Sequence, residues 1–169
     1  MGMPSKLKGF NLFQNGENFV GQVGEITLPK LTRATEDWRG GGMGGPIKID
    51  FGNDAIQMEW TAGGIMKSVL KQYGVLKHDG VLLRFAGGYQ REDEETFDSI
   101  EIVIKGRHTE IDMGTAKAKE DTAFKVTTSA SYYKLTINGE TIIELDFVNM
   151  IQNVDGSDLW AQLRTAIGL

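Results

Sequence analysis

The chain has 169 residues, which suits one domain that buries roughly 70% of the surface exposed by its unfolded chain. Hydrophobic residues make up 40% and charged residues 24%, which excludes disorder, and a net charge of −5 argues against a protein that grips nucleic acid through phosphates. The lack of cysteine excludes disulfides and thiolate metal sites, and because no apolar run reaches the length of a signal peptide or membrane span, we expect neither.

The N-terminal part predicts a β-hairpin. Residues 10–13 and 19–23 alternate apolar with polar side chains around Asn15-Gly16, a pair that favours the positive φ angles of a type I′ turn. In the next extended segment, 26–33, Pro29 cannot donate to a ladder hydrogen bond, so it marks an edge, a bulge or a strand start.

Two further hairpins are predicted in the middle of the chain. Residues 47–51 and 57–60 alternate on either side of a Gly-Asn-Asp turn at 52–54, and we expect these two segments to pair. Residues 83–90 and 100–107 alternate in the same way. The loop that joins them is acidic and contains Glu92, Asp93, Glu94 and Glu95.

The longest alternating segment begins at Phe124. Its apolar side chains keep one phase from 124 to 132 and then switch phase, so we predict a β-bulge near Tyr132-Tyr133. A second Asn-Gly pair, Asn138-Gly139, then returns the chain through residues 143–147.

Helices are few. Apolar residues recur at helical spacing over 65–73 before Gly74, a candidate C′ residue, and a second helix is predicted from Ser157 to Ile167. The fold class is therefore mainly β: an antiparallel β-sandwich or barrel with one flanking α-helix and a short C-terminal helix. No linker or repeat divides it, so residues 1–169 are predicted to form one domain.

No set of residues predicts an active site, a metal site or a cofactor site, and we expect no enzyme. The glycine-rich run 39–46 fits G-x-G-x-x-G only formally, because Pro46 leads into a strand pattern and not into a helix. His78 and His108 stand thirty residues apart and are predicted to be surface histidines. The acidic loop lacks calcium-binding spacing, and the strand hydroxyls lack a neighbouring His or Lys that could activate them.

One set of polar side chains has two readings. These residues alternate with apolar ones on two predicted strands, and they form either the wet side of an antiparallel sheet or the lining of a water-filled channel. The alternation leaves both readings open. The candidate lumen-lining residues are Glu101, Lys105, Arg107, Lys125, Thr127, Ser129 and Ser131.

A series of motifs in order along the whole chain resembles the major tail tube protein of contractile-tailed bacteriophages, a family also used in R-type bacteriocins. These motifs are TLPKLTR (27–33), WRGGGM (38–43), MEW (58–60), RFAGGYQR (84–91), GRHTEIDMG (106–114), KEDT (119–122), YYKLTINGE (132–140), DFVNMI (146–151) and the terminal IGL. The acidic segment around residues 92–95 departs from the family pattern.

The resemblance implies a structural virion protein that forms hexameric rings with a continuous inner β-barrel, stacked into a tube. Such a tube would be a conduit for DNA in a phage, without specific binding, or for ions in a bacteriocin. Its partners would be further copies of itself, the tail sheath, baseplate or initiator proteins and a tape-measure protein, assembled in the bacterial cytoplasm.

By the same resemblance, contacts between subunits and rings are expected at the glycine-rich loop and the C-terminal segment. The contact residues are Trp38, Arg39, Gly40, Gly41, Gly42, Met43, Gly44, Gly45, Pro46, Trp160 and Leu169. The alternative hypothesis is a monomeric β-barrel that binds a small ligand in an apolar interior pocket.

Overall fold

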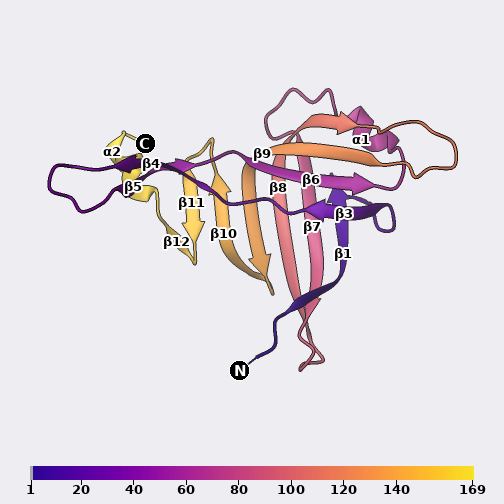
Figure 1. Cartoon of the computed structure of the whole chain (residues 1–169), viewed down its shortest axis with the longest axis horizontal. Coiled ribbons are helices and arrows are strands. Elements are labelled where there is room, and N and C mark those ends of the chain that lie inside the picture. Colours follow the sequence, from indigo (N-terminus) through magenta and orange to yellow (C-terminus); the bar gives the residue numbers. More distant parts are fainter. Residues whose placement is uncertain (1) are drawn as a thin grey trace.

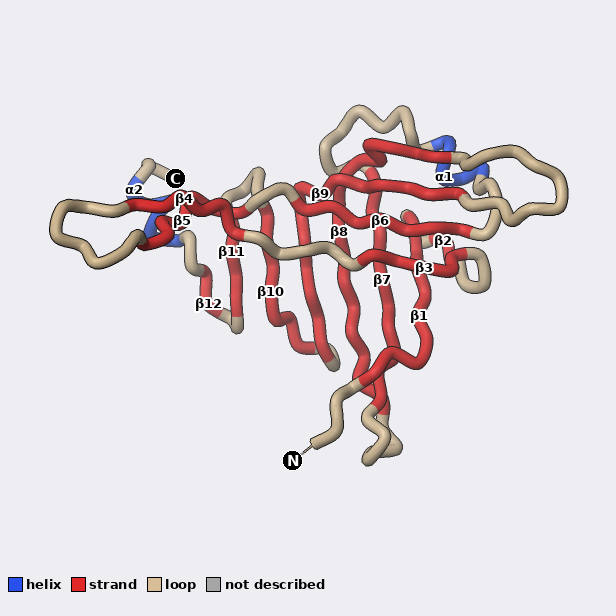
Figure 2. Tube along the Cα trace, in the orientation of Figure 1, coloured by secondary structure: helices blue, strands red, loops and turns tan. Residues whose placement is uncertain are grey.

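The computed structural model describes residues 2–169, which form a mainly antiparallel β structure with two short helices (Figures 1 and 2). The strands are β1 (Lys6–Gln14), β2 (Glu17–Asn18), β3 (Val23–Thr27), β4 (Arg33–Trp38), β5 (Ile47–Asn53), β6 (Ile56–Ala62), β7 (Val81–Gln90), β8 (Phe97–Asp112), β9 (Phe124–Ile137), β10 (Glu140–Asp146), β11 (Ile151–Val154) and β12 (Ser157–Asp158). The helices are α1 (Lys67–Lys71) and α2 (Ala161–Ala166).

The strands form two layers that share β8 and β9. The first layer, here called the long sheet, has the order β12-β11-β10-β9-β8-β7-β1-β2. The second, here called the short sheet, has the order β3-β6-β9-β8 and uses residues 124–130 of β9 and 106–112 of β8. Strands of the short sheet cross those of the long sheet steeply (Figure 1), as in orthogonal β-sandwiches.

Strands β8 and β9 pass from one layer to the other at a shared corner. Their register shifts between Lys105-Tyr132 and Gly106-Ala130, which leaves Ser131 as an extra, bulged residue. This confirms the predicted bulge near Tyr132-Tyr133, and it explains why the apolar side chains of β9 change phase there. A bulge at a corner lets one long strand bend and wrap around the core.

The core lies between the two layers and is filled by side chains of both. Its fully buried members include Leu12, Ile56, Met58, Trp60, Leu83, Phe85, Ile104, Phe124 and Val126. Helix α1 covers one end of the core with Met66 and Val69, although it is shorter than the predicted 65–73. Gly74 is not its C′ residue, because the helix is capped at Gln72.

His108 was predicted at the surface, and this prediction is wrong. The imidazole is 5% exposed on the core side of β8, with Nδ1 2.8 Å from Thr128 Oγ1 and Nε2 3.0 Å from Gln14 Oε1. Gln14 Nε2 donates to the carbonyl oxygen of Ser68, so its Oε1 accepts from His108 Nε2 while Thr128 donates to Nδ1. These bonds satisfy a neutral ring, and burial lowers its pKa to about 4. His78 is exposed, as predicted.

The turns differ in part from the sequence prediction. Both Asn-Gly pairs have positive φ angles and form hairpin turns, which confirms the predicted turns. The predicted strand 19–23 is wrong, because β2 after the first turn is only Glu17–Asn18, and Val23 begins β3, which pairs with β6. A third such turn lies at Asp155-Gly156, which joins β11 to β12. Ser157 therefore belongs to a strand and does not begin the C-terminal helix, which starts at Ala161.

The predicted pairing of residues 47–51 with 57–60 is also wrong. Strand β5 pairs with β4, whereas β6 pairs with β3 and β9. Gly52 has a φ of +107°, but the chain kinks there and runs on into β6 without reversing. The pairing of β3 with β6 (Thr27 opposite Glu59) continues in the same register as the pairing of β4 with β5 (Arg33 opposite Asn53). Residues 23–62 therefore form one long antiparallel ribbon.

Candidate assembly surfaces

The distal half of this ribbon, residues 33–53, is here called the arm. It projects from the body of the sandwich (Figure 1), and strands β4 and β5 form a separate two-stranded sheet. The glycine-rich loop 39–46 is its tip. There the amide of Gly40 lies 2.9 Å from Met43 Sδ, and the amide of Met43 donates to the carbonyl oxygen of Gly40 at 3.2 Å. The tip is therefore a compact turn, and it leads into strand β5 and not into a helix.

The arm has one apolar and one polar face, because side chains alternate along its strands. On the apolar face Trp38, Ile47 and Phe51 are 57%, 53% and 65% exposed, and Ile49 lies between them. The polar face carries ion pairs, Lys48 with Asp37 and Arg33 with Asp50. A two-stranded ribbon with an exposed apolar face is marginally stable in water, so it is suited to packing against another molecule.

The base of the arm rests on the C-terminal segment. Asn53 Nδ2 donates to Gln152 Oε1 at 3.0 Å, and Trp160 approaches the backbone of Gly52. A groove of about 360 Å³ lies between the two, lined on the C-terminal side by Gln152, Trp160 and Leu163. Trp160 is therefore half-buried where the arm begins, whereas Leu169 at the chain end is 75% exposed.

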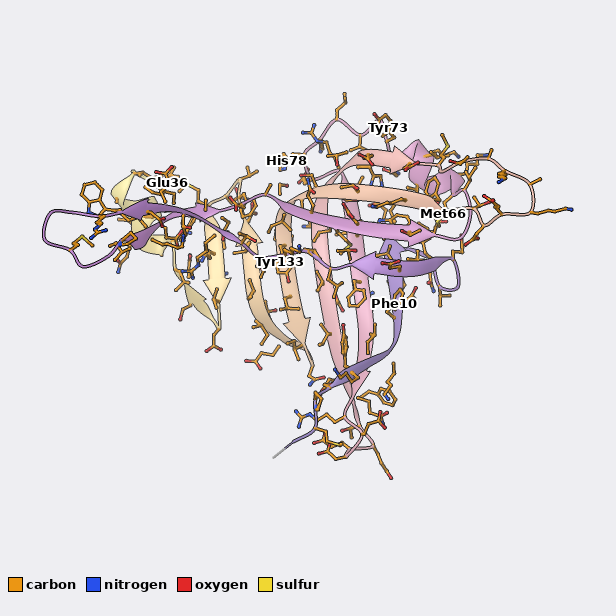
Figure 3. All side chains as sticks on the ribbon, viewed as in Figure 1. Phe10, Glu36, Met66, Tyr73, His78 and Tyr133 are labelled. Atoms are coloured by element: carbon orange, nitrogen blue, oxygen red, sulfur yellow. The ribbon has the colours of Figure 1, made fainter. Side chains whose placement is uncertain are left out.

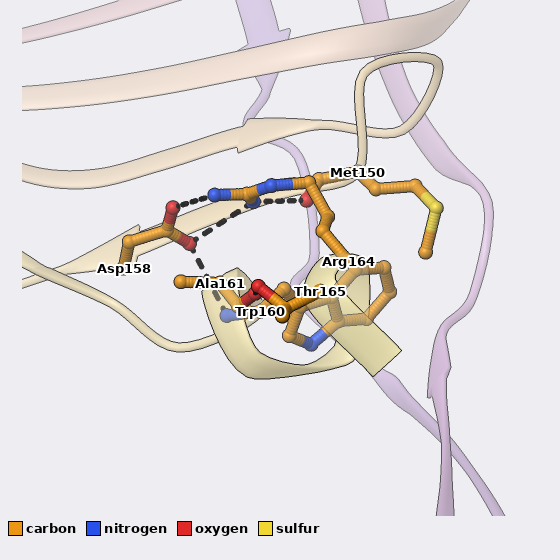
Figure 4. Close-up of polar contacts among 6 residues, drawn as sticks. All are labelled: Met150, Asp158, Trp160, Ala161, Arg164 and Thr165. Carbon is orange, nitrogen blue, oxygen red and sulfur yellow. Dashed lines mark hydrogen bonds and ion pairs between the residues drawn. The ribbon is translucent and has the colours of Figure 1, made fainter. Parts of the chain in front are cut away.

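Ionic and hydrogen-bond contacts of Arg164 connect α2 to the long sheet (Figure 4). Arg164 pairs with Asp158 of β12, and its Nη1 also donates to the carbonyl oxygen of Met150 at 2.7 Å. The hydrogen bond from Arg164 holds the pKa of the Asp158 carboxyl below its ordinary value. The guanidinium group of Arg164 thus links the C-terminal helix both to β12 and to the residue before β11.

The predicted lumen residues divide between the two layers. Glu101 and Lys105 lie on the long sheet on the face away from the core, where Glu101 pairs with Arg84 and Lys105 stacks over Tyr132. Ser131 occupies the corner bulge, with Oγ 2.8 Å from His78 Nδ1. The remaining four lie on the face of the short sheet away from the core, here called the outer face: Arg107, Lys125, Thr127 and Ser129.

The outer face is polar throughout, because it alternates with the buried side chains of the same strands. Its residues are Glu25, Thr27, Gln57, Glu59, Thr61, Arg107, Glu110, Asp112, Lys125, Thr127 and Ser129. Four carboxylates on this face (Glu25, Glu59, Glu110 and Asp112) stand against two cations (Arg107 and Lys125). One of these carboxylates, Glu59, forms an ion pair with Lys125 at 3.5 Å. Because carboxylates outnumber cations, the outer face carries an excess of negative charge.

The two sheets end differently at their edges. The long sheet ends in two-residue strands, β2 and β12, and the open part of β1 carries Lys6, Lys8 and a bulge, which are features that discourage edge pairing. The short sheet ends in β3 on one side and residues 107–112 of β8 on the other. Within residues 2–169 neither of these edges pairs with a further strand.

The acidic loop is stabilised locally. Glu92 pairs with Lys8 of β1, Glu94 pairs with Arg91, and the amide of Met3 donates to Asp93. Among residues 2–169, no three His, Asp or Glu side chains come together in a way that could hold a metal ion. Within the same residues, no helix is long and apolar enough to cross a membrane.

The interior bears on the alternative hypothesis of a ligand-binding barrel. Large side chains such as Trp60, Phe85 and Phe124 occupy the space between the two layers. A groove of about 620 Å³ exists elsewhere, where the ribbon opens between Thr27 and Asp54, and Lys30 and Glu59 contribute to its polar lining. The packing of the core does not favour the alternative hypothesis.

The subunit is an antiparallel orthogonal sandwich with an open-edged, polar-faced sheet and a projecting arm, and chains of contractile injection systems share its overall fold. The chain belongs to the family of phage tail tube protein FII, whose model matches residues 4–168. It is 44% identical over 172 residues to the tail tube protein of Escherichia phage P2, and the match covers 100% of both chains. It is 37% identical over 176 residues to the major tail tube protein of Serratia phage KSP20, covering 100% of this chain and 99% of that protein.

Solved structures show the same fold at low sequence identity. A chain in the sheath/tube terminator of an extracellular contractile injection system, PVC, superposes with a TM-score of 0.60 and 10% identity, covering 79% of this chain and 96% of that one. A chain of the PVC sheath-tube complex gives a TM-score of 0.59 at 9% identity, covering 79% and 91%. A chain of the anti-feeding prophage cap gives 0.60 at 11% identity, covering 80% and 93%.

Proposed function

We propose that six copies of this chain close their short sheets into one continuous β-barrel, and that these rings stack into the inner tube of a contractile tail. The role is structural and not catalytic. The tube is a passive conduit, for DNA in a phage or for ions in a headless bacteriocin. It belongs to the tail particle, is assembled in the bacterial cytoplasm, and contacts the sheath, baseplate or initiator proteins and a tape-measure protein.

The open edges of the short sheet are the observation that carries this proposal. Each strand of the order β3-β6-β9-β8 is antiparallel to its neighbour, so the two edge strands run in opposite directions. Residues 107–112 of one copy can therefore pair with β3 of the next copy and continue the antiparallel order. Ring closure would satisfy backbone groups that an isolated subunit leaves to water.

The charge of the outer face supports its assignment as the lumen. Proteins bind DNA through clustered cations that replace counterions at the phosphates. A lining of hydroxyls and amides with more carboxylates than cations offers no such cluster, so DNA would pass without being held. On this assignment Arg107, Lys125, Thr127 and Ser129 line the lumen, and Glu101, Lys105 and Ser131 do not.

The first test is negative-stain electron microscopy of the purified protein over a range of concentrations. We expect rings or hollow tubes, whereas monomers at every concentration would contradict self-assembly. Hydrogen exchange then tests the edges: amides of residues 23–27 and 107–112 should gain protection on assembly. Strand β7, already paired on both sides, is the control and should change little. Tubes whose edge amides exchange as fast as in monomers would contradict the continuous barrel.

A further inference from the structure

The apolar face of the arm carries a single charged side chain. Glu36 alternates into the same face as Trp38 and lies opposite Ile49 in the register. The two carboxylates of the polar face, Asp37 and Asp50, are paired with cations of the arm itself. Among residues 2–169, no cation pairs with Glu36. A surface that docks on this face must therefore be apolar and supply a cation.

The segment around α1 has this composition. Its exposed apolar side chains are Ile65, Tyr73 and Leu76, which are 61%, 61% and 90% exposed. Three lysines lie among them, and within the described part of the chain none of the three forms an ion pair. The α1 patch is defined here as Ile65, Lys67, Lys71, Tyr73, Leu76 and Lys77.

The two surfaces lie at opposite ends of the molecule. The arm projects beyond one end of the short sheet, and α1 lies at the other end (Figure 1); the labelled Glu36 and Tyr73 are correspondingly far apart (Figure 3). In one chain they cannot meet. A head-to-tail assembly joins unlike surfaces at opposite ends of successive copies, so the arm of one copy can reach the α1 patch of another.

We propose that the α1 patch is the docking surface for the arm of a second copy of this chain in the next ring. The apolar side chains of the arm pack on Ile65, Tyr73 and Leu76, and Glu36 pairs with Lys67 or Lys71. This inference rests on the proposed stacking of rings and adds the partner surface of the arm. The contact between successive rings would then be made on α1, which Met66 and Val69 anchor in the core.

Charge reversal and its rescue form the first experiment. Glu36→Lys places like charges at the contact, so the protein concentration needed for tubes should rise about tenfold or more while rings persist. Lys67→Glu with Lys71→Glu should have the same effect. Combining all three changes should restore tube formation. Glu17→Lys, the same change of charge on the exposed strand β2, is the control and should leave tubes unaffected.

The outcomes separate this inference from the proposed function. Rings without tubes in the reversed variants, and tubes in the combined variant, would support the docking. Tubes formed by Glu36→Lys as readily as by the parent would overturn the docking and leave the ring proposal intact. Monomers in the parent protein would overturn the proposed function itself.

A disulfide test checks the same contact without changing charge, and the chain contains no cysteine of its own. Copies with Ile47→Cys are mixed with copies with Tyr73→Cys, assembled and oxidised. We expect a covalent dimer that contains one of each. Phe97→Cys, at a similarly exposed aromatic residue of the long sheet, replaces the second variant as a control and should give none. Equal yields from the two mixtures would overturn the docking.

Discussion

Gly106 of β8 lies so close to Ser129 of β9 that a β-carbon on Gly106 would stand 1.8 Å from the Ser129 carbonyl oxygen. The contact occurs at the corner where both strands leave the long sheet and enter the short one. A hydrogen atom is therefore the only side chain that the corner admits, and the bend depends on this glycine.

Replacing Gly106 should destabilise the subunit strongly. Gly106→Ala forces the backbones of β8 and β9 apart, and we expect a loss of about 3 kcal/mol in the free energy of unfolding. Urea denaturation followed by tryptophan fluorescence measures it. Gly41→Ala is the matched control, because nothing lies within 4 Å of a β-carbon there. Equal unfolding midpoints for the two variants would show that the corner can relax around a methyl group.

Local turn chemistry made much of the fold predictable. Asn15-Gly16 and Asn138-Gly139 form the predicted hairpin turns, and the change of apolar phase in β9 located the bulge. Local chemistry failed where long-range pairing decided the outcome. The kink at Gly52 resembled a hairpin turn, but β6 finds its partners in β3 and β9. Asp155-Gly156 is an equally strong turn signal, but the strand that follows it, β12, is only two residues long and lies where the sequence predicts the start of a helix.

The candidate surfaces were predictable only in part. Residues Glu101, Lys105 and Arg107 share one phase of alternation, but the corner at Gly106 places Arg107 on the other sheet. Sequence periodicity cannot reveal that bend. The burial of His108 was predictable from the sequence, because this residue continues the alternation of the buried side chains Ile102 and Ile104. The ion pair of Asp158 with Arg164 was not predictable from the sequence, because it depends on Asp158 lying in strand β12 and not in a helix with Arg164.

The stability of the subunit should depend on pH through His108. The folded state binds a proton on this ring only below about pH 4, whereas the unfolded chain binds one below pH 6.5. The unfolded state therefore holds more protons between these values, and stability falls as the pH is lowered through this window. The full shift corresponds to a loss on the order of 3 kcal/mol, completed near pH 4.

The variant His108→Gln isolates this contribution from that of the carboxylates. Its free energy of unfolding should be lower near neutral pH but should change less between pH 6.5 and about pH 4 than that of the parent protein. Unfolding midpoints in urea across this range measure both slopes. His78→Gln, which removes an exposed imidazole outside the core, is the control variant. Parallel slopes for the parent and His108→Gln would contradict the buried neutral ring.

Removing Arg164 should release the C-terminal helix without unfolding the sandwich. Arg164→Ala deletes the contacts to both Asp158 and Met150, so residues after 160 should become sensitive to limited proteolysis. The Asp158 pKa, followed by NMR, should rise toward its ordinary value. Lys117→Ala, which removes an exposed ion pair with Glu120 in the loop after β8, should change neither measurement. A C-terminal segment that stays protected in Arg164→Ala would show that packing of Trp160 suffices.

Deleting residues 40–45 should separate folding from polymerisation. The tip of the arm makes its hydrogen bonds within itself, so its loss should leave the circular dichroism spectrum and the unfolding midpoint almost unchanged. We expect the shortened arm to lose its contact with neighbouring copies and tubes to be absent by electron microscopy. Full-length tubes from the deletion variant would remove residues 40–45 from the contact surface.

Two isoleucines of similar strand context should respond in opposite ways to the same change. Ile104 is fully buried in the core, and Ile104→Asp places an uncompensated carboxylate there, which should prevent folding. Ile47 is 53% exposed on the arm, so Ile47→Asp should fold with a normal unfolding midpoint but should not form tubes. Circular dichroism and electron microscopy of both variants measure the two effects. Because the same carboxylate is introduced in each, normal tubes from Ile47→Asp would mean that the apolar face of the arm is not an assembly contact.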